Sequence, residues 1–340
     1  MSEPAPVDPA TWAARAISAP LSPTYLADPS ARVVDGRVYV YCSHDVEAGI
    51  AFTDNGDHFA MTDYRVLVQD HPGAPAQDIG PILHVDDVPW AQRQMWAPDA
   101  VERDGRHYLY FPAKTAEGVF RIGVATSDSP TGPFVAEPEA IPGTYSIDPA
   151  VLLDDDGAAY LYFGGLWGGQ LQQYRDNVRD EANGVPAAHE PALGPRVGRL
   201  SEDMLTLAEP TREIQILDEE GRPLLEGDPR RYFEGPWVHK HGGRYWLSWS
   251  TGDSHTICHG VGDTPYGPFT YVGVLLEPVV GWTTQHSVVR WEDRWFLYYH
   301  DAVASGGTTH LRSVKVTELS VAPDGVIAPV QAYGGADPWA

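Results

Sequence analysis

Short runs of alternating polar and apolar residues recur along the chain, and five of them share one form. In each, an acidic or glycine-containing turn is followed by aromatic and aliphatic residues, and an apolar run stands before the turn. Side chains in a β-strand point alternately to opposite faces, so this pattern predicts five β-hairpins with two-residue turns. The five strings are 35–41 (DGRVYVY), 104–110 (DGRHYLY), 156–162 (DGAAYLY), 242–248 (GGRYWLS) and 292–298 (EDRWFLY).

A second pair of similar strings supports a repeated unit. The string DSPTGPF at 128–134 is similar to DTPYGPF at 263–269, where Pro and Gly would end the outer part of a repeat. Antiparallel units that cannot bury both faces alone are typical of a β-propeller when they stack around an axis. We therefore expect an all-β, five-bladed β-propeller, with a β-sandwich or barrel as the alternative.

We expect residues 1–340 to form a single catalytic domain without an accessory module, in which the first ~20 residues are an extension. The high counts of 11 Trp, 17 Tyr, 34 Gly and 30 Pro favour short strands and tight turns. The formal net charge of −24 repels phosphates and anionic lipids. These features disfavour nucleic-acid and membrane partners, and a neutral ligand such as a sugar fits better.

The sequence says less about the cellular location and the oligomeric state of the protein. Residues 1–23 contain no apolar core of a secretion signal, and no run of 18 apolar residues occurs, so we expect a cytoplasmic protein without a membrane span. Cys42 and Cys258 stand inside strand-like patterns, which predicts buried free thiols. The polar insert at 172–195 is either a dimer contact or a surface loop, and the oligomeric state stays open.

Three carboxylates stand at similar places in three repeats. Asp28, Asp148 and Glu234 precede their turn glycines by eight, nine and eight residues, and a proline follows each within two residues. An Asp-Pro pair alone is more typical of an exposed turn. Three acids in equivalent places would converge at one end of the propeller axis, where one could donate a proton to a glycosidic oxygen and another could activate water. A third would raise the proton affinity of the acid.

These motifs resemble glycoside hydrolase family 43 over nearly the whole chain. The resemblance implies an inverting enzyme in which Asp28 is the general base, Asp148 modulates the acid, and Glu234 is the general acid. The related retaining, fructan-cleaving family has Asn-Asp-Pro and Glu-Cys motifs, which Ala27 and Gly235 do not match. The motifs that carry the resemblance are Asp28-Pro29, Trp96-Ala97-Pro98-Asp99, Ile147-Asp148-Pro149, Glu234-Gly235-Pro236 and Gln285-His286-Ser287.

His286 occupies the repeat position that Asp99 has in the second repeat, six residues before the turn. A lone histidine is more often structural than a ligand. The resemblance implies an axial histidine that holds a calcium ion or a water cluster beneath the sugar. Because Ca²⁺ prefers oxygen, waters would have to supply its other ligands.

Arg312 and two tryptophans are the candidate substrate-binding residues. An inward-facing Arg312 in its strand-like setting would need acceptors, which an acidic pocket with a sugar provides; the alternative is a surface charge. Trp167 lies between glycines and is a candidate platform for a sugar ring. Trp96 has the same candidate role, with core packing as an equal alternative.

Three segments are most similar to the β-xylosidases of that family, which often have α-L-arabinofuranosidase activity. They are 164–169 (GGLWGG), 281–287 (GWTTQHS) and 309–315 (THLRSVK). The resemblance implies exo-acting release of xylose from the non-reducing end of short β-1,4-xylo-oligosaccharides, as part of xylan degradation. The alternatives are an arabinan-degrading arabinofuranosidase or arabinanase, and a non-catalytic propeller that binds glycans or proteins.

Overall fold

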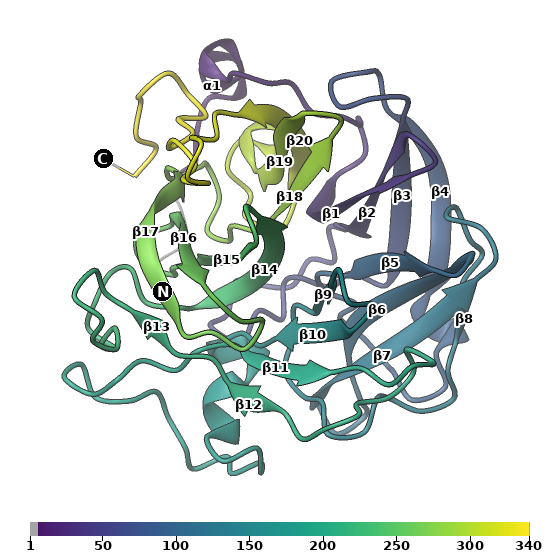
Figure 1. Ribbon diagram of the computed structural model, residues 1–340. Helices are drawn as coiled ribbons and strands as arrows, with labels where there is room; N and C mark the ends of the chain where they lie inside the picture. The colour runs from purple at the N-terminus through teal and green to yellow at the C-terminus, as the bar shows by residue number, and fades with distance from the viewer. Residues whose placement is uncertain (1–5, 340) are drawn as a thin grey trace.

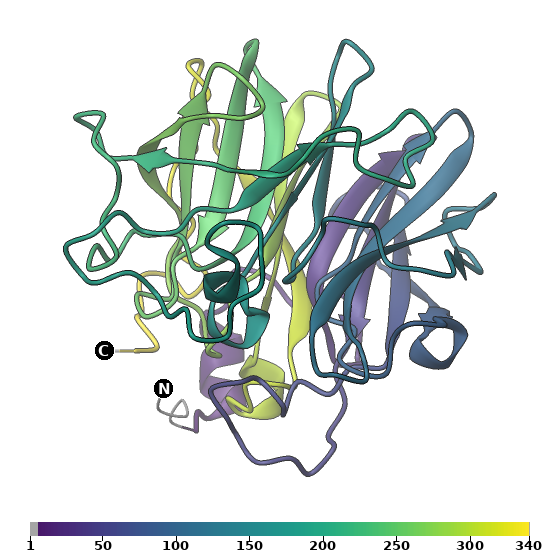
Figure 2. The same cartoon turned by 90° about the horizontal axis from the view of Figure 1, so that it is seen from below.

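Five β-sheets surround a central axis in the computed structural model, which describes residues 6–339 (Figures 1 and 2). The predicted five-bladed β-propeller is confirmed. Each sheet is one blade, and its strands follow one another outward from the axis, except that β13 of blade four pairs in parallel with β17 at the outer edge. The innermost strands β1, β5, β9, β14 and β18 pack side by side around the axis.

The strands of blade one are β1 (Leu26–Val34), β2 (Arg37–His44), β3 (Asp63–Gln69) and β4 (Gln77–His84). Blade two has β5 (Asp99–Arg103), β6 (Arg106–Lys114), β7 (Phe120–Ser127) and β8 (Val135–Ala136). Blade three has β9 (Ala150–Leu153), β10 (Ala159–Phe163), β11 (Arg196–Arg199) and β12 (Arg212–Glu213). Blade four has β13 (Ile216–Leu217), β14 (Glu234–His241), β15 (Arg244–Ser250), β16 (Ile257–Gly262) and β17 (Phe269–Leu276). Blade five has β18 (His286–Trp291), β19 (Arg294–Asp301) and β20 (Ser313–Leu319). The helices are α1 (Pro9–Arg15) and the short 3₁₀ segments η1 (Val85–Asp87), η2 (Trp167–Gly169), η3 (Leu171–Tyr174) and η4 (Val303–Ser305).

All five predicted hairpins are present, each joining the two innermost strands of a blade. Four of them have two-residue turns, as predicted. The prediction is wrong for blade three, where five residues, 154–158, separate β9 from β10. Carboxylates in this acidic loop accept hydrogen bonds from backbone N–H groups: Asp154 from Asp155 at 2.7 Å and Asp156 from Ala158 at 2.9 Å. These bonds stabilise a wider turn than the repeat pattern indicates.

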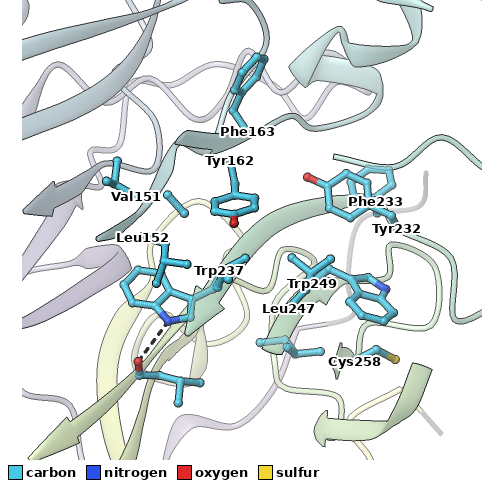
Figure 3. Packing of buried hydrophobic residues seen from close by; sticks show 14 of the residues in the cluster. Val151, Leu152, Tyr162, Phe163, Tyr232, Phe233, Trp237, Leu247, Trp249 and Cys258 are labelled. Atoms are coloured by element: carbon cyan, nitrogen blue, oxygen red, sulfur yellow. Dashed lines mark hydrogen bonds between the residues drawn. The ribbon is translucent and has the colours of Figure 1, made fainter. Parts of the chain in front are cut away.

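Aromatic and aliphatic side chains fill the space between neighbouring blades. Figure 3 shows part of this core, where Trp237 of blade four lies near Leu152 and Tyr162 of blade three. The Trp237 indole N–H donates to the carbonyl of Val288 at 3.1 Å, which ties blade four to blade five. Cys42 and Cys258 are buried and unpaired, as predicted.

The two ends of the described chain pack against blade five and against each other. Leu21 N–H donates to the Val314 carbonyl of β20 at 2.8 Å, and Ile17 N–H donates to Ala332 at 3.0 Å. Of the predicted N-terminal extension, residues 1–5 lie outside the described residues; the described part includes α1 beside η4. The insert at 172–195 contains η3 and many exposed positions, and its role stays a prediction. Among the described helices, none has the length and apolarity that a membrane crossing requires.

Candidate active site

A β-bulge in three innermost strands presents the acidic residues. In blades one and four, two residues lie opposite one partner, between Ala27 and Ser30 and between Glu234 and Trp237. Blade three has the same arrangement, because the Ile147 carbonyl accepts from Gly164 N–H at 2.7 Å before regular pairing starts at Ala150. A bulge re-aims the side chains next to it, which brings them to one end of the axis.

The first bulge residue has a positive φ in each of these blades: 53° at Asp28, 58° at Asp148 and 64° at Gly235. A proline follows each one. Asp28 and Asp148 are therefore equivalent, whereas Glu234 precedes the equivalent position by one residue. The prediction that all three acids share one repeat position is corrected on this point. Gly235 takes the left-handed conformation, and Glu234 begins β14 directly before it.

The three carboxylates nevertheless line one pocket. Asp28 and Asp148 are buried, and Glu234 is partly exposed. Gly235 N–H donates to Asp148 Oδ2 at 2.9 Å, so the residue after Glu234 is bound to the neighbouring acid. The other lining residues come from segments next to all five blades, including Phe52, His58, Phe59, Met61, Trp96, Trp167, Phe233, Trp282, Thr283, Gln285 and Arg312.

Asp28 is surrounded by hydrogen-bond donors. Arg312 Nη1 donates to its Oδ1 at 2.8 Å, and the Ser43 hydroxyl donates to its Oδ2. The backbone N–H of Asp28 donates to His300 Nδ1 at 3.1 Å. Burial and the nearby Arg312 lower the pKa of His300 to about 4, so this imidazole is neutral near pH 7 and can accept. Arg312 and Ser43 therefore fix the position of the Asp28 carboxylate.

The pKa values of the other two acids are raised. Burial and the neighbouring Asp148 and Asp28 carboxylates raise the pKa of Glu234 well above its usual range. Burial and Asp28 likewise raise the pKa of Asp148. The site therefore holds one carboxylate paired with a cation beside two acids that retain protons more strongly, an arrangement suited to acid and base chemistry in one pocket.

Arg312 joins the pocket to a buried residue that sequence reasoning missed. The guanidinium donates to Asp45 from Nε at 2.9 Å and from Nη2 at 2.8 Å, and its backbone N–H donates to the same carboxylate at 2.7 Å. Arg312 lies one residue before β20 and faces inward, not outward as a surface charge. Asp45 follows the end of β2, where no motif or spacing marks it.

Aromatic side chains form the walls. Trp167 has a φ of 51° and packs on Phe233 with ring centroids 5.3 Å apart and on Trp282 at 6.0 Å. Trp96 lines the pocket and also packs against Phe120, with ring centroids 4.7 Å apart, so its role as a sugar platform stays a prediction. Sequence reasoning did not name Phe233 or Trp282 as site residues, although Phe233 directly precedes the Glu234 motif and Trp282 lies inside the quoted segment 281–287.

His286 begins β18 near the axis, and its Nε2 lies 2.5 Å from the Ser248 hydroxyl. The strand pairing corrects its predicted equivalence to Asp99: Asp99 pairs with Tyr110 four residues before its turn pair, and the corresponding residue of blade five is Ser287, opposite Tyr298. Asp99 itself binds Arg32 and the Val151 N–H and is structural. The Nδ1 of His286 is buried and has no hydrogen-bond partner among the described residues.

The chain is similar to proteins of known family and structure. A model of the family described as glycosyl hydrolases family 43 matches residues 17–327. A xylosidase/arabinosidase of Bacteroides ovatus is 53% identical over 309 residues, which cover 90% of this chain and 95% of that protein. A solved GH43_1 enzyme of Xanthomonas citri, complexed with xylotriose, is 61% identical with a TM-score of 0.93 and covers 98% of this chain and 99% of its own. A β-xylosidase/α-arabinofuranosidase from a compost metagenome, solved with xylotriose in a calcium-free form, is 54% identical with a TM-score of 0.91, covering 93% and 98%.

Proposed function

Since the chain belongs to glycosyl hydrolase family 43, we propose that it is an exo-acting, inverting β-xylosidase that also removes α-L-arabinofuranosyl units. Its substrates would be short β-1,4-xylo-oligosaccharides, cleaved at the non-reducing end. The observation that carries the proposal is the convergence of Asp28, Asp148 and Glu234 with Arg312 in one pocket. Similarity to a xylosidase/arabinosidase and to an enzyme complexed with xylotriose supports the substrate class.

In the proposed reaction, Glu234 donates its proton to the glycosidic oxygen as the bond to the anomeric carbon breaks. A water molecule attacks the opposite face of that carbon, and Asp28 takes the proton from the water. The raised pKa of Glu234 keeps a proton available for the leaving oxygen. Arg312 contacts Asp28 at 2.8 Å and holds the carboxylate of the proposed base in place. Asp148 acts on Glu234 through its negative charge and through its bond to Gly235.

The loops over the mouth support exo action. A β-carbon added at Gly168 would lie 2.7 Å from the carbonyl oxygen of Asn55, so the loop of blade one touches the Trp167 loop of blade three. This contact closes one side of the pocket, because no room remains between the two backbones. A chain end can enter such a pocket, whereas the middle of a polymer needs a groove open at both ends. Trp167 and Trp96 would then form walls for the sugar ring.

We also propose a hydrated calcium site at His286. The free, buried Nδ1 fits one ligand position, and no group of three or more His, Cys, Asp or Glu that could hold a metal occurs among the described residues. Water would therefore supply most of the oxygen ligands that Ca²⁺ prefers. When bound, the ion would add positive charge on the axis, and no step of the proposed reaction passes through it.

The test is an assay of purified protein on p-nitrophenyl β-D-xylopyranoside and α-L-arabinofuranoside, with NMR of the sugar first released from xylobiose. We expect α-xylose, the inverted product, and losses of about a hundredfold or more in Asp28→Ala and Glu234→Ala. Asp104→Ala, in the exposed turn of blade two, is the matched control. If neither glycoside is cleaved while all variants bind xylose as the wild type does, the non-catalytic binding propeller replaces the proposal. Internal cleavage of arabinan would favour the arabinanase alternative.

A further inference from the structure

The end of the described chain lies behind one wall of the active-site pocket. This wall is Trp282, which is only 8% exposed. The indole N–H of Trp339 donates to the Val279 carbonyl at 3.0 Å. The backbone N–H of Val280 donates to the hydroxyl of Tyr333 at 3.1 Å. Two residues near the end of the described chain therefore bind the backbone just before Trp282.

Tyr333 is a fixed partner for this segment. Its hydroxyl donates to Asp301 Oδ2 at 2.7 Å, and the Lys315 ammonium donates to the same oxygen at 2.6 Å. All three residues are at most 2% exposed, so the two charges are paired away from water. Breaking a buried ion pair is costly, and this pair holds Tyr333 against blade five. The segment before Trp282 is thus tied to a buried part of the propeller.

His255 lies between Trp282 and Trp339 and contacts both. Its Nδ1 is 3.0 Å from the Trp282 carbonyl oxygen. Burial lowers the pKa of His255 below its ordinary value, so the ring is neutral near pH 7 and has one N–H group. Because a carbonyl only accepts, Nδ1 carries that hydrogen and donates it. The other contact is a stack on Trp339, with ring centroids 3.7 Å apart and planes 10° apart.

The loop that carries His255 also supports a second aromatic wall. This loop joins β15 to β16, and in it the His255 N–H donates to the Gly252 carbonyl at 2.7 Å. A β-carbon added at Gly252 would lie 2.9 Å from the Phe233 ring, so the loop is in contact with that wall. One loop of blade four therefore lies behind both Phe233 and Trp282, whose ring centroids are 5.3 Å apart.

We propose that His255 is a positioning residue for substrate binding. Together with Trp339 it holds Trp282 in the place where this wall contacts the sugar. His255 itself lies outside the lining of the pocket, so it acts on a bound sugar only through Trp282. The inference rests on the proposed function, because the pocket must hold the terminal xylose. A wall contacts the sugar in the ground state and in the transition state alike, so its displacement should raise KM and leave kcat nearly unchanged.

The test measures kcat and KM for p-nitrophenyl β-D-xylopyranoside in His255→Gly, His255→Asn and Trp339→Ala. His255 has a φ of 51°, which Gly and Asn both adopt readily, so neither variant strains the loop. Gly removes the side chain, whereas the amide of Asn can still donate to the Trp282 carbonyl. We expect KM to rise by about three- to tenfold in His255→Gly and Trp339→Ala, the effect of one lost hydrogen bond or ring contact. In His255→Asn, KM should be restored toward the wild-type value.

His189→Ala and Trp291→Ala are the controls, because they remove the same residue types elsewhere. His189 is exposed, and Trp291 ends β18, the strand whose start adjoins the pocket residue Gln285. Both variants should keep the wild-type KM. If His255 and Trp339 contribute only to packing, Tm would fall in their variants while KM stayed the same, and that result would overturn the proposal.

The two proposals fail in different ways. A wild type that cleaves the xyloside, while His255→Gly and Trp339→Ala keep its KM, contradicts the positioning role and leaves the β-xylosidase function standing. A rise in KM as large in His255→Asn as in His255→Gly would also overturn the role, because the hydrogen bond would then not hold Trp282. If His255→Gly does not fold, the KM of Trp339→Ala decides in the same way. A wild type that does not cleave the xyloside contradicts the proposed function, and the positioning role falls with it.

Discussion

Arg312 lies between two buried carboxylates and donates 2.8 Å hydrogen bonds to both Asp28 and Asp45. Its side chain is almost completely buried, as are both partners. In this arrangement Asp45 holds the guanidinium in place, and the guanidinium holds the proposed general base. The relationship links blade one, which carries both acids, to the chain just before the last strand of blade five.

Replacing Arg312 should therefore damage both folding and activity. Arg312→Gln leaves two buried carboxylates without their cation, and removal of one partner from a buried ion pair typically costs about 3–5 kcal/mol. We expect a lower free energy of unfolding in urea and a strong loss of kcat/KM for p-nitrophenyl β-D-xylopyranoside. Arg290→Gln, an exposed arginine on β18, is the control and should match the wild type. An Arg312→Gln enzyme with full stability would contradict the role given to this pair.

Asp148 should set the pH range of activity through its charge. Because the Asp148 carboxylate raises the pKa of Glu234, Asp148→Asn should lower that pKa. The basic limb of the kcat/KM profile, where the general acid loses its proton, should then move to lower pH. The side-chain amide oxygen can still accept from Gly235 N–H, so the backbone contact can be kept. Asp156→Asn, in the acidic turn of blade three, controls for a general change in charge, and a basic limb that does not move would count against the modulating role.

Glu234 should lower stability at neutral pH while it serves catalysis. Its pKa is raised in the folded protein, so the folded state binds this proton more tightly than the unfolded chain does. The corresponding stability is present below the unfolded pKa and is lost as the pH rises through the folded pKa, at about 1.4 kcal/mol per pH unit between the two. Glu234→Gln stays neutral and avoids this loss.

We therefore expect inactive Glu234→Gln to have a higher Tm than the wild type at pH 7, with the difference shrinking as the pH falls toward 4.5, the ordinary pKa of a glutamic acid. Differential scanning calorimetry across this range measures it. Glu318→Gln, at an exposed position of β20, should show no such pH-dependent gain. Equal Tm values for Glu234→Gln and the wild type at pH 7 would mean that the carboxylate is not destabilised in the folded protein.

The blades and the three acids could be predicted because their signals are local. A two-residue turn and the alternation of polar and apolar residues in a strand can both be recognised from consecutive residues. The prolines after the acids mark the strand starts. A β-bulge adds one residue to its strand opposite the partner strand, and it does not change the alternation of polar and apolar residues. The repeat positions of Glu234 and His286 were one residue off because the count began at Gly242 and Glu292, the first residues of their turns, but at Gly36 and Gly105, the second residues of theirs.

Asp45 and Trp282 show what local patterns cannot predict. Asp45 binds Arg312, 267 positions away in the chain, and no periodicity connects two loop residues at that distance. Trp282 becomes a wall of the pocket only because Trp167 and Phe233, from blades three and four, pack against it. Asp45 depends on the closure of the propeller, which brings blade five against blade one. Trp282 depends on the packing of its loop against blades three and four.

His286 offers a test of metal binding that does not depend on activity. A ligand that binds only the folded state raises stability with its concentration, by about 2.7 kcal/mol at one hundred times its Kd. If Ca²⁺ is bound through the free Nδ1, calcium should raise the Tm of EDTA-treated wild type, and His286→Ala should lose this shift. His189→Ala, an exposed histidine of the insert, should respond as the wild type does. Mg²⁺ demands stricter octahedral geometry and gives up its waters reluctantly, so it should have a smaller effect. An equal calcium shift in His286→Ala would mean that calcium binds elsewhere, and the free nitrogen would then be assigned to a water molecule.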